Sequence, residues 1–222
     1  MIVSEKNKFI FIHIPRTAGT YVSREICKKL GIKRWREFIG EPKELINKEG
    51  NSIGNSYSGK YKKYESDKHI TARKLSDRIG REKWKSYFKF AFVRNPWDRI
   101  LSVYLKRRKE SSGLKEVLFS DSKINFNIYI YLKYGVGVGK TKKQTDYIMD
   151  GNNVIVDYIG RFERLSEDLN KVSKKIDLNI DEGGVYDSTG GREYKNYFNR
   201  LSKGIVDKFC EKEIRNFGYN FG

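Results

Sequence analysis

The sequence contains few of the residues on which disulfide scaffolds and zinc proteins depend. It has two cysteines, Cys27 and Cys210, and two histidines, His13 and His69, in 222 residues. Two cysteines do not make a disulfide framework, and because both lie in segments patterned as helices, we expect reduced thiols. The cysteines and histidines also lack the close spacing of zinc ligands. These shortages argue against a disulfide-rich fold and against a structural zinc site.

Long apolar runs and prolines are also scarce. No apolar stretch approaches the ~20 residues that span a bilayer, so we expect no transmembrane segment and no dependence on a membrane. None of the three prolines marks a linker between domains. The first residues lead directly into an apolar strand pattern, with no signal sequence before it. We therefore expect a cytoplasmic protein with a single domain over residues 1–222.

Acidic residues are far outnumbered by basic ones. The chain has 46 Lys and Arg against 28 Asp and Glu, a formal net charge of +18. Such a charge suits a nucleic acid, a polyanionic glycan or a multiply charged nucleotide as partner. A lysine-rich surface that reflects general composition explains it equally well. Charge alone does not choose among these alternatives.

The most informative pattern is the segment Phe9–Gly31. Its apolar run, Phe9–Ile14, has the β-branched and aromatic character of a strand covered on both faces. Pro15 and Gly19 then mark a tight turn, and a helical pattern follows. The segment predicts a strand, a short loop and a helix in direct succession.

The loop between this strand and helix predicts an anion site. Its backbone N–H groups and the helix N-terminus point toward one place, which favours a negatively charged ligand. Thr17 or Thr20 is a candidate cap for the helix, and Arg16 adds a full positive charge. The sequence therefore predicts phosphate binding near the amino terminus.

A second strand, Phe88–Val93, ends in Arg94, and Pro96 suits the first turn of the helix that follows. A P-loop NTPase usually carries an acidic magnesium ligand at this place. Here Arg94, with Ser102 eight residues later, suits a second phosphate, and nothing suits a metal. Two phosphate sites without a magnesium ligand predict a nucleotide phosphorylated on two different oxygens.

The rest of the chain alternates between helical and strand patterns, which predicts an α/β fold with a P-loop-like, three-layer arrangement and a central parallel sheet flanked by helices. The stretch 40–68 is a basic, aromatic loop that suits an acceptor-binding wall or is merely solvated. Glycines at 135–139 imitate a phosphate-binding loop, but the spacing fails. We expect helices at 73–80, 83–87, 100–110, 124–134, 165–176 and 203–215, and a third strand at 154–159.

These motifs resemble those of the PAPS-dependent carbohydrate sulfotransferases, the family that includes heparan and chondroitin sulfotransferases. The resemblance rests first on FIHIPRTAGT and FKFAFVRNPWDRILSVY. It continues through HITARKL, VDYIGRFERLSEDL and the closing FGYNF, and so covers nearly the whole chain. The two phosphate motifs are specific in combination.

The resemblance implies a co-substrate, 3′-phosphoadenosine 5′-phosphosulfate (PAPS), and no metal. It implies that the 3′-phosphate binds to Arg94 and Ser102. It also implies a 5′-phosphosulfate loop made of Arg16, Thr17, Ala18, Gly19 and Thr20. Arg16 stands where the family usually has Lys, and it keeps the charge while offering a bidentate donor.

Sulfuryl transfer to an alcohol needs a general base as well as cations at the leaving phosphate. His69 opens the HITARKL segment, close to where related glycan 2-O-sulfotransferases place a histidine base. We therefore expect His69 and Arg16 to be catalytic, with a carboxylate such as Glu163 as the alternative base. His13, inside the first strand, suits a core position bonded to backbone.

Several other side chains have weaker indications. Trp97 and Asp98 suit packing and capping of the turn after the second strand, and Arg99 suits either a phosphate or an ion pair. Gln144, Tyr147 and Arg192 lie in segments that could reach a nucleotide or an acceptor, although a structural role explains them more simply.

The sequence therefore favours an enzyme that transfers a sulfuryl group from PAPS to a hydroxyl of a saccharide or glycoconjugate, possibly acidic, with no nucleic-acid partner. A P-loop-like nucleotide kinase is one alternative, and it requires magnesium. A non-catalytic module that binds polyanions or nucleic acid is the other, and only the charge supports it.

Overall fold

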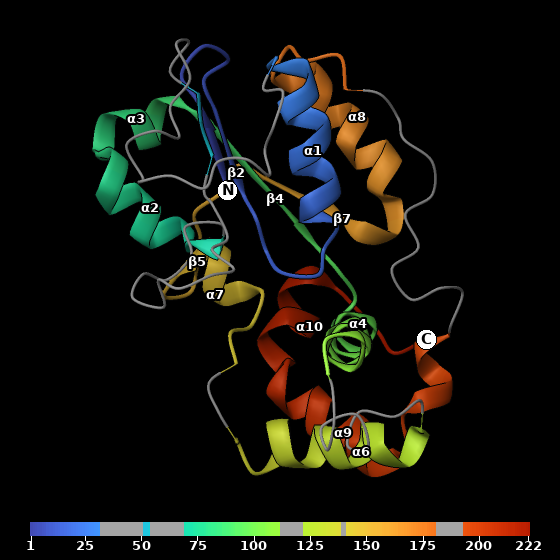
Figure 1. The fold of residues 1–222 in the computed structure, drawn as a ribbon. Helices are drawn as coiled ribbons and strands as arrows, with labels where there is room; N and C mark the ends of the chain where they lie inside the picture. The colour runs from blue at the N-terminus through green and yellow to red at the C-terminus, as the bar shows by residue number, and fades with distance from the viewer. Residues whose placement is uncertain (32–50, 54–68, 112–121, 139–140, 181–192) are drawn as a thin grey trace. The chain divides into compact units, whose positions relative to one another are not determined.

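A computed structural model describes residues 1–31, 51–53, 69–111, 122–138, 141–180 and 193–222 (Figure 1). Contacts between Cα atoms divide the chain into two compact units. The first unit comprises Met1–Val93 and Asp146–Val185, and the second comprises Arg94–Thr145 and Tyr186–Gly222. A single sulfotransferase domain over the whole chain stays a prediction.

The first unit is built on a five-stranded mixed sheet in the order β3-β1-β2-β4-β7. Strands β2, β4 and β7 are parallel, whereas β1 runs antiparallel to both β2 and β3. The strands are β1 Ile2–Ser4, β2 Phe9–Ile12, β3 Asn51–Ile53, β4 Phe88–Val93 and β7 Tyr158–Arg161.

The expectation of a parallel sheet therefore holds for the three strands on one side and is wrong for the other two. Only residues 5–8 join β1 to β2, and Lys8 has a positive φ of 52°. So short a connection allows only antiparallel pairing, because parallel neighbours need a long crossover.

Aromatic side chains at alternate positions form the core of the first unit. Phe9 and Phe11 of β2 and Phe90 and Phe92 of β4 are fully buried, as the two-residue period of a strand requires for one face. They pack in one cluster with apolar residues of the helices α1 (Gly19–Lys29) and α8 (Leu165–Lys175). Figure 1 shows α2 (Ala72–Ile79) and α3 (Arg81–Ser86) on the opposite side of the sheet. Helices thus flank the sheet on both faces, as expected.

The predicted strand at 154–159 is divided into two elements. A small hairpin, β5 Met149–Asp150 with β6 Asn153–Val154, follows the short helix α7 (Thr145–Ile148), and β7 begins only at Tyr158. Asp157 makes the transition, because its backbone N–H donates to Lys89 O at 2.8 Å and its carboxylate accepts from Lys89 N at 2.7 Å. The apolar run spans both elements, so periodicity could not reveal the break.

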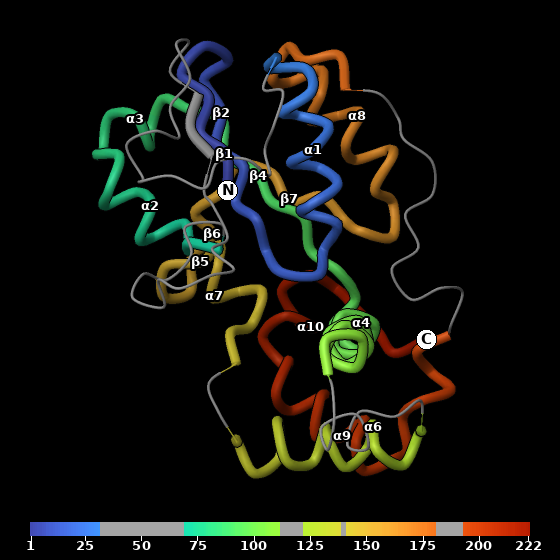
Figure 2. Tube along the Cα trace, in the orientation of Figure 1, coloured from blue at the N-terminus to red at the C-terminus, as the bar shows by residue number. Residues whose placement is uncertain are grey.

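The second unit is helical (Figure 2). Its core is aromatic. The ring of Tyr104 on α4 lies 5.2 Å from that of Phe126 on α6, and Phe126 contacts Phe198 at 4.9 Å. Its elements are α4 Pro96–Lys109, α6 Lys123–Ile130, the π-helical segment η3 Tyr131–Gly135, the 3₁₀ turn η5 Tyr194–Tyr197, α9 Arg200–Phe209 and α10 Glu211–Phe217.

Two helices predicted in this unit differ from those in the structure. The helix expected at 124–134 changes to π geometry at Tyr131, and the last helix is two helices that meet at Cys210. Cys210 and Cys27 are free and buried, so the expected thiols are present. Burial raises the pKa of Cys27 to about 12 and also raises that of Cys210, which keeps both protonated at neutral pH.

Candidate active site

The loop after β2 has the strand–loop–helix form that the sequence predicts. β2 ends at Ile12, a turn covers residues 15–18, and α1 begins at Gly19. The helix has no side-chain cap, however, and its N-cap residue is Ala18 in the left-handed conformation. Thr17 does not cap, because its buried hydroxyl donates to Ile14 O at 3.0 Å inside the turn. Thr20 does not cap either, because it lies within the first turn of the helix.

Two residues of this loop have unusual backbone angles. Arg16 has a φ of 69° and Ala18 a φ of 62°, in a region that non-glycine residues seldom adopt. Such conformations cost free energy and are concentrated at functional sites. Successive N–H groups in alternating conformations make a concave anion site, and an uncapped helix N-terminus adds further donors. The loop geometry therefore suits an anion.

Gly19 allows the ring of His13 to lie directly against the start of α1. A Cβ built on Gly19 would be 2.1 Å from Cδ2 of His13 and 2.3 Å from its Nε2. No side chain larger than hydrogen fits in that space without displacing the ring. His13 is buried, as the sequence predicts, and it packs against Gly19 at the end of the loop.

His69 lies next to this pair although it is 56 positions from His13 in the chain. The two imidazole rings are 4.6 Å apart between centroids, in an edge-to-face arrangement. Nδ1 of His69 is 3.0 Å from the carbonyl oxygen of His13. A carbonyl only accepts, so Nδ1 carries the proton in this contact, and Nε2 is the basic nitrogen whenever the ring is neutral. The structure thus brings the predicted base to the end of the predicted loop.

Arg94 and Ser102 belong to the second unit, where both are buried. Arg94 is 1% exposed and Ser102 is 0% exposed. Asn95 caps α4 by accepting from the N–H groups of Trp97 and Asp98, a role that the sequence analysis did not assign. Asp98 instead accepts a hydrogen bond from Nε of Arg94 at 2.7 Å, which orients the guanidinium.

The backbone of Arg94 is held by a buried side chain from a distant segment. The amide of Gln144 accepts from Arg94 N at 2.8 Å and donates to Arg94 O at 2.8 Å. Gln144 in turn donates to the Glu213 carboxylate through its side chain, at 2.8 Å, and through its backbone N–H. Gln144 therefore positions Arg94, which is the structural role that the sequence favoured for it. Glu213 was missed, since nothing in its helical pattern distinguishes it from a surface glutamate.

The other candidates have structural surroundings or lie outside the described residues. Trp97 packs edge-to-face on Phe221 and donates to Asp207 at 3.0 Å, so the packing expected of it is present, whereas the cap of α4 is Asn95. Arg99 and Tyr147 are buried, whereas Glu163 is exposed in the 3₁₀ turn η4 (Phe162–Arg164). Arg192 and, apart from β3, the stretch 40–68 lie outside the residues that the structure describes.

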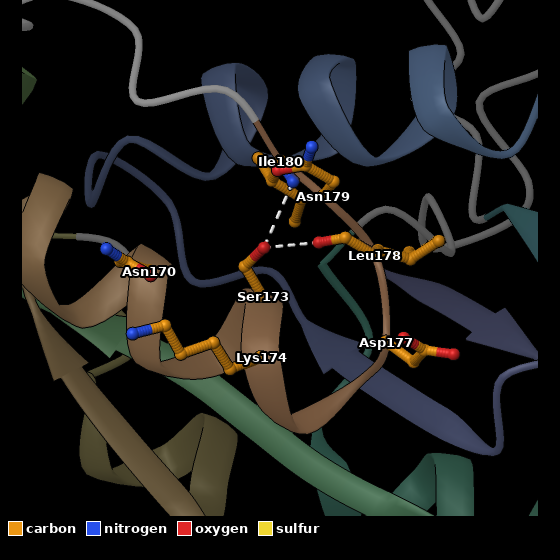
Figure 3. Close-up of a pocket in the computed structure, with 7 residues that line it drawn as sticks. All are labelled: Asn170, Ser173, Lys174, Asp177, Leu178, Asn179 and Ile180. Carbon is orange, nitrogen blue, oxygen red and sulfur yellow. Dashed lines mark hydrogen bonds between the residues drawn. The ribbon is translucent and has the colours of Figure 1, made fainter.

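A polar hollow at the end of α8 contains none of the predicted site residues (Figure 3). Figure 3 shows Ser173 between two backbone groups there, and its hydroxyl donates to Leu178 O and accepts from Ile180 N at 3.0 Å. These bonds close the turn after the helix. The hollow has a structural explanation and is not part of the candidate site.

Two further observations concern the described part of the chain. It holds no group of three or more His, Cys, Asp and Glu residues arranged to bind a metal ion. Of the helices described, none has both the length and the apolar character that crossing a bilayer requires.

Comparison with known proteins agrees with the motifs. A sequence model of the sulfotransferase family matches residues 1–212. A protein of Archaeoglobus fulgidus described as uncharacterized is 34% identical over 104 residues, which is 47% of this chain and 79% of that protein. The match over 1–212 includes both phosphate motifs and the His69 segment. The chain therefore belongs to the sulfotransferase family.

Proposed function

We propose that this protein transfers a sulfuryl group from PAPS to a hydroxyl of a saccharide or glycoconjugate. Family membership supports sulfuryl transfer in general. The observation that carries the finer proposal is the position of His69. Its ring contacts that of His13, which lies beside the loop that leads into α1. A base next to an anion-binding loop is what an attack on a bound phosphosulfate requires.

The loop residues Arg16 to Thr20 bind the 5′-phosphosulfate in this proposal. The positive φ angles at Arg16 and Ala18 and the uncapped start of α1 support an anion there. Arg16 is partly exposed, and in this proposal its guanidinium neutralises charge on the leaving phosphate. Donors placed where charge develops stabilise the transition state more than the ground state.

Arg94 and Ser102 bind the 3′-phosphate in this proposal. Arg94 follows directly after β4, and β4 is the parallel neighbour of β2. In open α/β sheets, ligands bind beyond the carboxyl ends of such strands. Asp98 accepts from Nε of Arg94, which fixes the plane of the guanidinium that would bind the phosphate.

The reaction follows from these roles. The acceptor hydroxyl oxygen attacks sulfur, a new S–O bond forms, and the bond from sulfur to the 5′-phosphate oxygen breaks in line with it. Nε2 of His69 takes the hydroxyl proton, because Nδ1 is committed to the carbonyl of His13. The electron pair of the broken bond stays on the phosphate, where Arg16 stabilises it. The products are a sulfate ester and 3′-phosphoadenosine 5′-phosphate.

Other parts of the proposal rest on the same resemblance or on the sequence pattern alone. They are a P-loop-like three-layer fold, metal-independent donor binding, a cytoplasmic location and an acceptor that is a sugar, possibly acidic. The formal charge of +18 would guide a polyanionic donor and an acidic acceptor. A nucleotide kinase is disfavoured, because the residue directly after β4 is Arg94 and not a magnesium-binding carboxylate.

Calorimetry with 3′-phosphoadenosine 5′-phosphate in the presence of a chelator tests the donor. We expect binding without metal and much weaker binding of 5′-AMP; equal affinity for the two would refute the assignment. Transfer of labelled sulfate from PAPS across a panel of sugars and glycans then tests the acceptor. Labelling of a tyrosine peptide and of no sugar would replace the saccharide with another acceptor class.

A further inference from the structure

The second unit exposes apolar side chains along one continuous segment. Residues Ile124 and Ile128 of α6 are 71% and 48% exposed, and Tyr131 of η3 is 50% exposed. They lie at intervals of four and three positions, so they share one face of the helix. Leu132, Val136 and Val138 continue the exposed series. We call these six residues, together with Leu201, the α6 patch.

Leu201 extends the patch onto a second helix. It is 63% exposed at the start of α9, and together with Ile124, Ile128 and Tyr131 it lines a mainly apolar hollow of about 520 Å³. Among the described residues, Val154 is the one large apolar side chain that is exposed outside this patch. Scattered exposed apolar residues need no explanation, but a contiguous group of this kind marks an interaction surface.

The charge around the α6 patch indicates its partner. Among the residues of the stretch 123–145 that the structure describes, four are lysines and none is aspartate or glutamate. A second copy of the chain is a poor fit, because a two-fold interface would set these lysines against the same lysines. The partner must be apolar where it meets the isoleucines and anionic where it meets the lysines.

We propose that the α6 patch binds the surface of an anionic lipid bilayer. Isoleucine, leucine and valine side chains enter the boundary between headgroups and acyl chains, while lysines on long stems reach the lipid phosphates. Tyr131 has the apolar ring and polar hydroxyl that suit this boundary. Val136 and Val138 alternate with glycines in the sequence after the helix, so small apolar side chains continue the patch along the backbone there.

This binding needs no spanning helix and is independent of the proposed donor site. It revises the expectation of a protein that acts without a membrane: a patch lying in the interface involves no long apolar run, so hydropathy along the sequence does not reveal it. A protein held in this way would meet acceptors attached to lipids more often than free ones.

Sedimentation of the full chain with vesicles tests the proposal. We compare phosphatidylcholine vesicles with vesicles that also contain phosphatidylglycerol, at low and at physiological salt. The decisive variant is I124Q/I128Q, which removes apolar contact without changing the charge. We expect the variant to lose about tenfold or more of its affinity for phosphatidylglycerol vesicles. The matched control V154Q removes an exposed apolar residue of the first unit and should bind as the wild type does.

A spectroscopic measurement separates insertion from simple charge attraction. The Tyr131→Trp variant should show blue-shifted tryptophan emission with phosphatidylglycerol vesicles, because the indole ring at this position leaves water. Unchanged affinity of a folded I124Q/I128Q variant would overturn the proposal, since the basic surface alone would then account for binding. A wild-type dimer that this variant disperses, or binding to an acidic amphipathic peptide but not to vesicles, would overturn it as well.

Discussion

Nδ1 of His69 lies 3.0 Å from the carbonyl oxygen of His13, a contact that joins two residues 56 positions apart. The carbonyl can only accept a hydrogen bond, so Nδ1 must carry the proton, and the neutral ring is the tautomer with a basic Nε2. The contact also holds the His69 ring edge-to-face against the ring of His13, which itself lies against Gly19 at the start of α1. One backbone carbonyl therefore orients the proposed base and sets its protonation pattern.

Replacing His69 should reduce turnover without reducing donor affinity. We expect His69→Ala to lower kcat by about 10²- to 10⁴-fold, the usual contribution of a general base. His69→Gln is the matched control, because its amide N–H can still donate to His13 O but cannot take a proton. Both variants should bind 3′-phosphoadenosine 5′-phosphate as the wild type does in calorimetry. Wild-type turnover in His69→Gln would assign the base to another residue, with Glu163 the next to test.

Arg16 should tolerate lysine better than alanine. Arg16→Lys keeps a cation at the leaving phosphate, whereas Arg16→Ala removes it, so we expect a fall in kcat of about 10²-fold or more in the alanine variant. Steady-state kinetics with PAPS makes the comparison. Similar activity of the alanine and lysine variants would show that charge at this position is not needed for the chemistry.

Arg94 and Ser102 should discriminate a 3′-phosphate from its absence. A hydrogen bond to a charged group contributes about 1.5–3 kcal/mol, so Arg94→Ala and Ser102→Ala should each weaken the bisphosphate by about tenfold or more. Affinity for 5′-AMP should change little. Calorimetry with both ligands measures the difference.

The Arg94 variant needs a control for folding, because it leaves Asp98 without its partner at 2.7 Å. Ser102→Ala removes only a hydroxyl and makes the cleaner test. Equal losses for the bisphosphate and 5′-AMP in a folded Ser102→Ala protein would place the 3′-phosphate elsewhere.

Gly19→Ala should disturb the loop through His13. The added methyl would lie 2.1 Å from Cδ2 of His13, and such overpacking typically costs about 1–3 kcal/mol of stability. We expect a lower melting temperature and weaker binding of 3′-phosphoadenosine 5′-phosphate. The matched control is Gly204→Ala in helix α9, where a new Cβ meets nothing within 4 Å. That change should be neutral or stabilising by about 0.5–1 kcal/mol.

Asp168 should make the free energy of unfolding depend on pH in the acidic range. Its carboxylate is buried, which alone would raise its pKa, but hydrogen bonds from Arg161 N, Lys171 and Tyr158 outweigh burial and lower the pKa below its usual value. A lowered pKa stabilises the fold above the pKa of the unfolded chain, and that stability is lost as pH falls through the folded value.

The measurement is denaturant unfolding of wild type and Asp168→Asn as a function of pH. We expect Asp168→Asn to be less stable than the wild type by about 1–3 kcal/mol at neutral pH, with the difference shrinking below about pH 4. A difference that stays constant down to strongly acidic pH would show that the loss is one of packing and not of charge.

Elements of both units could be predicted from local patterns. The strand Phe88–Val93 has the bounds that its apolar run predicts, and Pro96 opens α4 as expected. The helix cap failed for a local reason, because the Thr17 hydroxyl bonds to Ile14 O and the chain turns into the helix through a left-handed Ala18. A threonine near a helix start does not reveal which acceptor its hydroxyl will choose.

The long-range contacts at the candidate site could not be read from the sequence. Gln144 and Glu213 hold Arg94 through buried hydrogen bonds, yet they are 50 and 119 positions away from it. Neither has a neighbouring motif that would single it out. The α6 patch was missed for a different reason. Its residues follow a normal helical period, and only their exposed fractions in the folded chain show that they are not buried.

The sequence by itself determined the family, the order of the strands and helices around both phosphate motifs, and the residues available for chemistry, because short motifs and apolar periods depend on local backbone preferences. The tertiary structure alone decided which side chains meet. It reversed β1 in the sheet, packed His13 against Gly19, set the tautomer of His69 and clamped Arg94 through Gln144. These contacts join distant segments, and the burial and hydrogen bonding that stabilise them exist only in the folded chain.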